Sequence, residues 1–379
     1  MPPIKRRILW AAGIGLALLS LAACNAGSDD GPPPPTVVKH YAYLIDPLSP
    51  SVIAFTIDPE TGVPTPSHNF SLASDLGPLS LAVTPSGRYA YVVGHNSRGV
   101  FAYSIDPATG AWNGVAGTPF SSGVQPSRIA VEPAGRYAYV ASDQDGAIAV
   151  LRIDDGTGRL TPIAGSPFSA PCRPDELVIE PGGRYAYVIC ADTGAVSGFA
   201  IDGNTGALTG LGGSASVGTD PETLTVDPAG RRLYVANFGS KDISAFAIDA
   251  ATGALTAVPG SPFPVPQPPP FMLFPWAIAI DPSGRAAFVA CMGSMTLASF
   301  LIDESTGAMA PTGSGVTTWN SPVAISFGPT GRHIYVLHSS DPGTLSYYEI
   351  EPATGAIWLK DALTAGQFPS VLVVSRLSR

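Results

Sequence analysis

Ile105-Asp-Pro-Ala-Thr-Gly110 is the string that decides the fold, because versions of it recur along the chain. The pattern Ile-(Asp or Glu)-x-x-Thr-Gly begins at Ile57, Ile105, Ile153, Ile201, Ile248, Ile302 and Ile350. Successive copies are 48, 48, 48, 47, 54 and 48 residues apart. A period of this length predicts one small supersecondary unit repeated seven times, rather than several unrelated domains.

Residues 89–136 illustrate what one repeat contains. Aromatic and β-branched residues predict strands at 89–93, 100–105, 111–115 and 128–132. The Asp, Pro and Gly of the recurrent string suit a tight turn after the second of these strands, so we assign its repeated Asp to turn chemistry. Four antiparallel strands in about 48 residues predict one blade of a β-propeller.

The two ends of the repeat region predict how the ring closes. The first repeat opens at Tyr41 with the second strand of a blade, and the chain finishes at 369–375 with the first strand of a blade. One blade built from both ends leaves no open edge. We therefore expect an all-β, seven-bladed propeller, with four antiparallel strands per blade, over residues 39–379.

The beginning of the chain indicates export. Basic residues at 5–7 precede an apolar run at 8–21 that is too short to span a membrane comfortably, and Leu21-Ala-Ala-Cys24 follows. This string resembles the lipobox of bacterial lipoproteins, in which the cysteine is lipidated; an ordinary secretory signal is the alternative. We expect a lipoprotein signal peptide at 1–24 and a Pro-rich tether at 25–38. Asn25 favours the outer membrane, facing the periplasm or the cell surface.

Composition and motifs limit the partners. A net charge of −9 disfavours nucleic acid and anionic membrane surfaces, so the lipid on Cys24 is the one expected membrane contact. The five histidines form no ligand-spaced pair, and no phosphate, dinucleotide or haem motif occurs, so we expect no metal and no cofactor. Asp143-Gln-Asp145 leaves calcium open. We expect a monomer.

Three cysteines remain after Cys24. Cys172 and Cys190 flank a predicted hairpin at 181–184, which brings them to the same end of a blade. An exported protein can form this disulfide, but the sequence leaves its presence open. Cys291 is then expected to be a buried free thiol.

Several strings resemble the lactonase family of seven-bladed propellers, which includes 6-phosphogluconolactonases, carboxymuconate cycloisomerases and related exported repeats with a Tyr-Val-x-Asn strand. They are 85–92, 105–111 and 228–237, and the likeness covers 41–379. The resemblance implies lactone hydrolysis, for which family enzymes carry Pro-Arg-His at the start of an inner strand. No histidine follows the equivalent prolines here, at 79–80, 127–128, 175–176, 222–223, 276–277, 323–324 and 370–371.

Departures from the repeat on one face of the ring supply the candidate site, because function in a propeller usually lies around the central channel. Arg128 and Glu176 occupy equivalent positions in neighbouring repeats and are expected to meet, either for acid–base work or as a structural ion pair. The candidate catalytic residues are Arg128, Glu176 and Glu222. The candidate ligand-binding residues are Arg173, Asp175, Asn237, His338, Phe274 and Trp276. The last two belong to a Pro-rich insertion at 262–276 that either walls an apolar pocket or plugs the channel.

Two functions follow. The first is an exported, lipid-anchored module that binds a small molecule or a protein at the propeller face without an intact catalytic motif. The second is a lactonase-type hydrolase resembling 6-phosphogluconolactonase, in which Glu176 or Glu222 activates water and Arg128 or Arg173 stabilises the oxyanion. The missing Pro-Arg-His string favours the first, and whether the protein is an enzyme stays open.

Overall fold

The computed structural model describes residues 39–73, 76–94, 96–266, 274–313, 315–318, 320–351 and 354–377. The predicted signal peptide, Cys24, the tether and positions 267–273 of the insertion lie outside these residues. All regular structure in the described part of the chain is β-strand. No helix there is long and apolar enough to cross a membrane.

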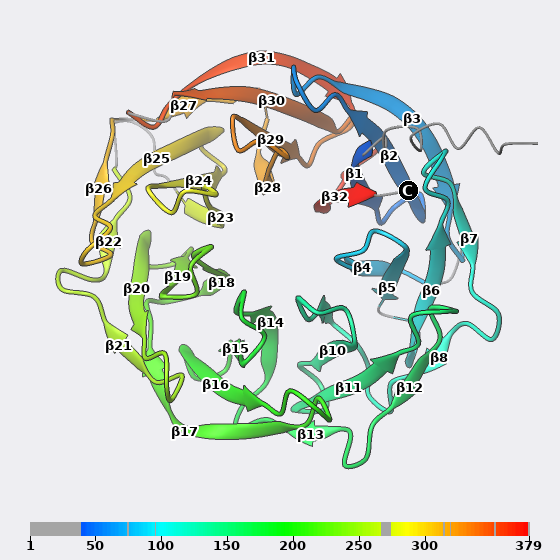
Figure 1. The fold of residues 1–379 in the computed structure, drawn as a ribbon. Helices are drawn as coiled ribbons and strands as arrows, with labels where there is room; N and C mark the ends of the chain where they lie inside the picture. Colours follow the sequence, from blue (N-terminus) through cyan, green and yellow to red (C-terminus); the bar gives the residue numbers. More distant parts are fainter. Residues whose placement is uncertain are drawn as a thin grey trace, which may run out of the picture. The chain divides into compact units, whose positions relative to one another are not determined.

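The repeats form seven blades around a centre (Figure 1). From the centre outward, blade 1 contains β32 (Val371–Leu377), β1 (Lys39–Asp46), β2 (Ser51–Ile57) and β3 (Pro64–Ser71). Blade 2 contains β4 (Pro78–Val83), β5 (Tyr89–Gly94), β6 (Gly99–Ile105), and β7 (Trp112–Gly114) with β8 (Phe120–Ser121). Blade 3 contains β9 (Arg128–Val131), β10 (Tyr137–Ser142), β11 (Ala147–Ile153), and β12 (Leu160–Pro162) with β13 (Phe168–Ser169).

Blade 4 contains β14 (Pro174–Ile179), β15 (Tyr185–Cys190), β16 (Ala195–Ile201) and β17 (Leu208–Ser216). Blade 5 contains β18 (Pro221–Val226), β19 (Arg232–Asn237), β20 (Asp242–Ile248), and β21 (Leu255–Ala257) with β22 (Phe263–Pro264). Blade 6 contains β23 (Phe274–Ile280), β24 (Ala286–Met292), β25 (Thr296–Ile302), and β26 (Met309–Pro311) with β27 (Val316–Thr317). Blade 7 contains β28 (Pro322–Phe327), β29 (His333–His338), β30 (Thr344–Glu351) and β31 (Ala356–Thr364).

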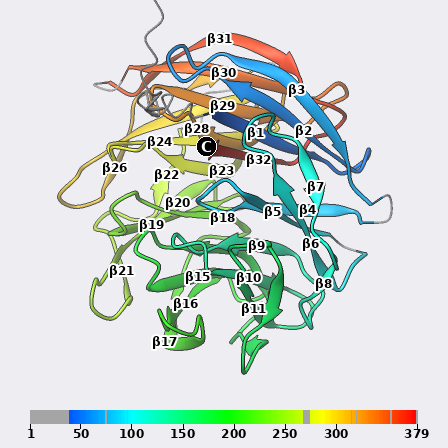
Figure 2. The ribbon, with the colours of Figure 1, turned by 45° about the vertical axis from the view of Figure 1, so that its right-hand side comes forward.

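The ring closes through blade 1, as the sequence predicts. β32 pairs antiparallel with β1 from Lys39 opposite Leu377 to Ile45 opposite Val371, and the two strands lie side by side in the turned view (Figure 2). The innermost strands contact one another in the order β4, β9, β14, β18, β23, β28 and β32, and β32 contacts β4. The fold class and the closure by both ends are therefore confirmed.

Each Asp of the recurrent string makes the turn that its residue type predicts. Asp106 Oδ1 accepts hydrogen bonds from the backbone N–H groups of Ala108 and Thr109, both at 2.8 Å. The same bond to the Thr backbone recurs at Asp58, Asp154, Asp202, Asp249 and Asp303. Donors from the turn hold the pKa of these five carboxyls below the usual value, and that of Asp303 at about 2.

Tyrosines of the second strands contact the Thr-Gly turns of the next blade. Tyr91 Oη donates to the carbonyl of Gly158, the last residue of the Thr-Gly turn in the next blade, at 3.1 Å. Equivalent bonds come from Tyr139, Tyr187, Tyr234 and Tyr335. Gly158 has φ = +73°, and a Cβ there would overlap the ring of Tyr89. Glycine is therefore required both by the turn and by the neighbouring ring. Blade 6 has Phe288 in place of the donor tyrosine.

Candidate functional site

The starts of the inner strands place the candidate residues at one end of the central channel. In five blades a proline at the first or second position of the inner strand lies opposite the last part of the second strand, and the register shifts directly after it. These prolines are Pro78, Pro174, Pro221, Pro275 and Pro322. A bulge adds a residue to one strand and redirects its side chain, so the residues after these prolines are free to depart from the repeat.

Arg128 on β9 and Glu176 on β14 face each other, as their equivalent positions predict. Arg128 Nε lies 2.9 Å from Glu176 Oε2, and the two side chains are 31% and 22% exposed. Arg128 Nη1 donates to the carbonyl of Ser127 at 3.2 Å, and Glu176 Oε1 accepts from the Leu177 N–H at 3.3 Å. The pair joins blades 3 and 4 and is held in place by their backbones.

Glu222, at the start of β18 in blade 5, extends this cluster. Its pKa is raised by burial and by the negative charges of Asp175 and Asp220, while Arg128 opposes the shift. The pKa of Arg128 is raised overall: burial would lower it, but Glu176, Asp175 and Glu222 outweigh burial. Three adjacent inner strands thus place one guanidinium among several carboxylates, one of which favours its protonated form more than usual.

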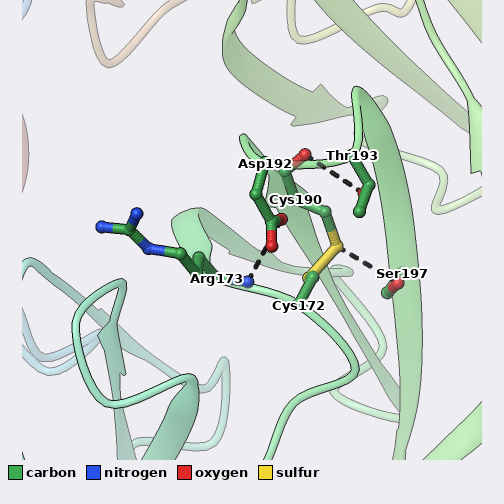
Figure 3. The surroundings of a disulfide bond; sticks show 6 residues. All are labelled: Cys172, Arg173, Cys190, Asp192, Thr193 and Ser197. Carbon is green, nitrogen blue, oxygen red and sulfur yellow. Dashed lines mark hydrogen bonds between the residues drawn. A yellow bond between two sulfur atoms is a disulfide. The ribbon is translucent and has the colours of Figure 1, made fainter.

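Arg173 lies beside the cluster but is bound elsewhere. Its Nε donates to the carbonyl of Asp143 at 2.9 Å, and its side chain is 60% exposed in an ion pair with Asp143. The Arg173 N–H donates to Asp192 Oδ1 at 3.3 Å (Figure 3). Asp145, the other acid of the loop at which the sequence left calcium open, accepts from the Ser142 hydroxyl at 2.7 Å. Both acids of that loop therefore have protein partners.

A disulfide joins Cys172 and Cys190, which the sequence left open (Figure 3). It ties the segment that leads into β14 to the end of β15, two residues before the inner strand begins. Asp175 and Glu176 are therefore carried by a strand whose start is covalently fixed. Cys291 is free and buried, as expected, and burial raises its thiol pKa to about 12.

Asn237 and His338, predicted to bind ligand, are both fully buried at the ends of β19 and β29. Asn237 Nδ2 donates to Asp242 Oδ1 at 2.7 Å and to Ser244 Oγ at 2.9 Å. His338 Nδ1 lies 3.0 Å from the carbonyl of Asn320, and burial lowers its pKa. These bonds join each side chain to its own blade.

The end of the insertion at 274–276 belongs to a group of aromatic side chains. The Phe274 and Trp276 rings lie 4.9 and 6.0 Å from the ring of Phe238, and Lys241 Nζ lies 5.2 Å from the centre of Phe274. Phe238 was not among the residues predicted for the site. It directly follows Asn237, where equivalent repeats have Asp143, Ala191 or Ser339, so its departure from the repeat was the available signal.

The fold and the channel end define a class: a seven-bladed propeller whose inner strands present a charged cluster beside an aromatic group. The chain belongs to the lactonase family of seven-bladed β-propellers, because the family model described as "Lactonase, 7-bladed beta-propeller" matches residues 39–219 and 212–273. No curated protein matches the sequence.

Solved structures share this fold at low sequence identity. A putative 6-phosphogluconolactonase from Bacteroides uniformis is 17% identical, with a TM-score of 0.74 over 89% of this chain and 99% of that chain. One from Bacteroides fragilis is 19% identical, with a TM-score of 0.74 over 89% and 98%. The periplasmic gluconolactonase of Pseudomonas aeruginosa is 19% identical, with a TM-score of 0.70 over 89% and 99%.

Proposed function

We propose that the protein hydrolyses a neutral sugar lactone at the Arg128–Glu176–Glu222 cluster. The observation that carries the proposal is the Glu222 carboxyl, whose pKa is raised by burial and by Asp175 and Asp220, close enough to Arg128 for their charges to interact. A carboxyl with a raised pKa suits proton transfer near neutral pH, and a guanidinium suits a developing oxyanion. The structural similarity to proteins described as gluconolactonases supports this chemistry over other uses of the fold.

In the proposed reaction, ionised Glu222 takes a proton from a water molecule as the water oxygen attacks the lactone carbonyl carbon. Arg128 stabilises the negative charge on the carbonyl oxygen, and Glu176 fixes the orientation of the guanidinium through its 2.9 Å bond. The ring C–O bond then breaks, and the proton held by Glu222 passes to the leaving oxygen. The product is a hydroxy acid, which ionises to its carboxylate.

The charges of the cluster favour an unphosphorylated substrate. Asp175, Glu176 and Glu222 act on the Arg128 guanidinium and Asp220 acts on Glu222, so a phosphate group would meet more negative than positive charge. The neighbouring Phe238 and Trp276 rings offer an apolar wall for the C–H face of a sugar ring. The carboxylates also repel the anionic product, which aids its release.

The test is acid release from D-glucono-1,5-lactone in a pH-stat, after subtraction of the spontaneous rate. We expect E222Q to lower kcat at least about 100-fold, because general base catalysis contributes roughly that much. E304Q is the matched control, since Glu304 pairs with Arg285 in an exposed ion pair. A wild-type rate no higher than background, or an E222Q variant as active as E304Q, would refute hydrolysis at this site.

A second function is binding without turnover, and one observation favours it. Arg128 already has two protein partners, Glu176 and the Ser127 carbonyl, so its role could be completed by joining two blades. Calorimetric titration with the lactone and with gluconate separates the two functions. Saturable binding of a ligand by the wild type, weakened in R128M and accompanied by no acid release, would establish the binding module.

We further propose that the protein is exported and lipid-anchored through Cys24, as a monomer in the outer membrane. The support is the basic, apolar and Leu-Ala-Ala-Cys sequence of residues 5–24. Radiolabelled palmitate should be incorporated by the wild type and not by C24A, which should accumulate unprocessed. Equal labelling of both would contradict the anchor.

A further inference from the structure

Blades 2, 3 and 5 have the same sequence element, (Ser or Thr)-Pro-Phe, at the outer edge of their sheets. It occupies 118–120, 166–168 and 261–263. Its hydroxyl accepts a backbone N–H from the neighbouring strand: Thr118 from Ala102 at 2.8 Å, Ser166 from Val150 at 2.9 Å, and Ser261 from Ala245 at 2.8 Å. Its ring packs toward the next blade, where the Arg159 guanidinium lies 5.2 Å from the centre of Phe120. The element therefore satisfies a backbone donor and closes the gap between two blades.

Blade 4 lacks this element. The element is also absent from blades 1, 6 and 7. In blade 4 the register of β16 and β17 places Ala215 opposite Val196, where blades 2, 3 and 5 place Phe120, Phe168 and Phe263 opposite equivalent residues. Ala215 has no ring, and Gly213 stands where the hydroxyl residue would be. The register also shifts between Ser197 and Phe199, so that positions 211–213 bulge opposite Gly198. The side chains of β17 therefore supply neither the hydroxyl nor the phenyl ring of this element.

The missing element leaves two hollows on either side of the bulge. The larger, of about 650 Å³, lies between β16, β17, Thr193, the segment 169–172 and the Cys172–Cys190 disulfide. Figure 3 shows Thr193 and Ser197 beside that disulfide. The smaller, of about 230 Å³, lies between the bulge and residues 252–255 of blade 5. The volume of the larger hollow, here called the β17 groove, is in the range of small-molecule sites.

The lining of the β17 groove selects the kind of ligand. None of its lining residues is charged. Phe199 and the disulfide contribute apolar surface. Four residues contribute hydroxyl groups: Ser169, Thr193, Ser197 and Ser214. Ser197 is 3% exposed, and its Oγ lies 3.3 Å from Cys190 Sγ, a weak acceptor. Such a hydroxyl is costly to bury without better partners, so it favours an oxygen-bearing ligand.

An ionic ligand fits this groove poorly, because no countercharge would offset the loss of its hydration. A purely apolar ligand would displace water from these hydroxyls without replacing its hydrogen bonds. A molecule with many hydroxyls and one apolar C–H face matches both parts of the lining. We propose that the β17 groove is a second site, separate from the channel, that binds a neutral saccharide.

The proposal is tested by calorimetric titration of the purified protein with D-glucose and maltose. T193W places a large ring in the groove from an exposed position, and T161W is the matched control, because Thr161 is an exposed threonine on β12 outside the lining. We expect T193W to weaken saccharide binding at least about tenfold and T161W to leave it unchanged. The variant G213S/S214P/A215F, which restores the repeated element, should abolish saccharide binding.

Variants at the channel make this result independent of the proposed hydrolysis. R128M and E222Q should bind the saccharide as the wild type does, whatever happens to lactone turnover. Absence of saturable binding by the wild type, or binding that T193W does not weaken, overturns the site. Galacturonate binding as tightly as glucose, or displacement of the sugar by the apolar dye Nile red, overturns the assignment to neutral saccharides.

Discussion

Replacing Arg128 with methionine should destabilise the propeller most at neutral pH. The guanidinium and the Glu176 carboxylate are 2.9 Å apart and 31% and 22% exposed. Exposed ion pairs contribute about 0.2–1 kcal/mol, whereas removal of one partner from a fully buried pair costs about 3–5 kcal/mol. A pair of intermediate burial should lie between these limits, so we expect R128M to lower the free energy of unfolding by about 2 kcal/mol at pH 7.5.

The pH dependence of this cost arises from the carboxylates around Arg128, which lose its positive charge in the variant. Without Arg128, which opposes the shift, the pKa of Glu222 in the folded state should rise further above that of the unfolded chain. An acid with a raised folded pKa stabilises the fold below its unfolded pKa of about 4, and loses this contribution as the pH rises through the folded pKa. The cost of R128M should therefore shrink on going from pH 7.5 to pH 4.

Urea denaturation followed by tryptophan fluorescence measures this cost for R128M, E176Q and the double variant at both pH values. The double-mutant cycle should give a coupling of about 1–2 kcal/mol between the two residues. R285M is the control, because the Arg285–Glu304 pair is 63% and 53% exposed and should cost at most about 1 kcal/mol. The reasoning fails if R128M costs no more than R285M, or costs more at pH 4 than at pH 7.5.

Other perturbations address the ring, the disulfide and the contacts between blades. Removal of 371–379 deletes β32 and the Leu372 side chain, so cooperative melting by circular dichroism should be lost; an unchanged transition would contradict closure through blade 1. C172S/C190S should lower the free energy of unfolding in urea by about 3 kcal/mol, because the cysteines are 18 residues apart. Equal stability of the wild type and this variant would argue against the disulfide. Y139F should lose about 1 kcal/mol with its bond to Gly206, and no change in Tm would show that packing alone holds the turn.

The sequence was sufficient for the ring because its repeated strings specify local and inter-blade contacts together. The Asp of these strings forms its own turn, and five of the turns accept a tyrosine hydroxyl from the preceding blade, so periodicity alone implied the architecture. The meeting of Arg128 with Glu176 followed from their separation of 48 residues, which equals the period. The start and end of the repeat also predicted the blade that both ends share.

Other parts of the site depended on packing that periodicity does not specify. Asn237 and His338 lie at strand ends as predicted, but their burial and their bonds within their own blades are not specified by the period. Phe238 lies in a short connection whose shape no repeated string encodes. The β17 groove forms where β17 lacks the (Ser or Thr)-Pro-Phe element. The effect of this difference became clear only from the pairing of β16 with β17.

The pairing of Lys39 with Leu377 makes the chain suitable for circular permutation. In the other blades a short hairpin links the inner strand to the second, as residues 84–88 link β4 to β5. The same five-residue hairpin could join 377 to 39 in a chain lacking residues 1–38, and any other inner hairpin could then be cut to give new termini. A family of circular permutants should follow, each making a different blade the last to form.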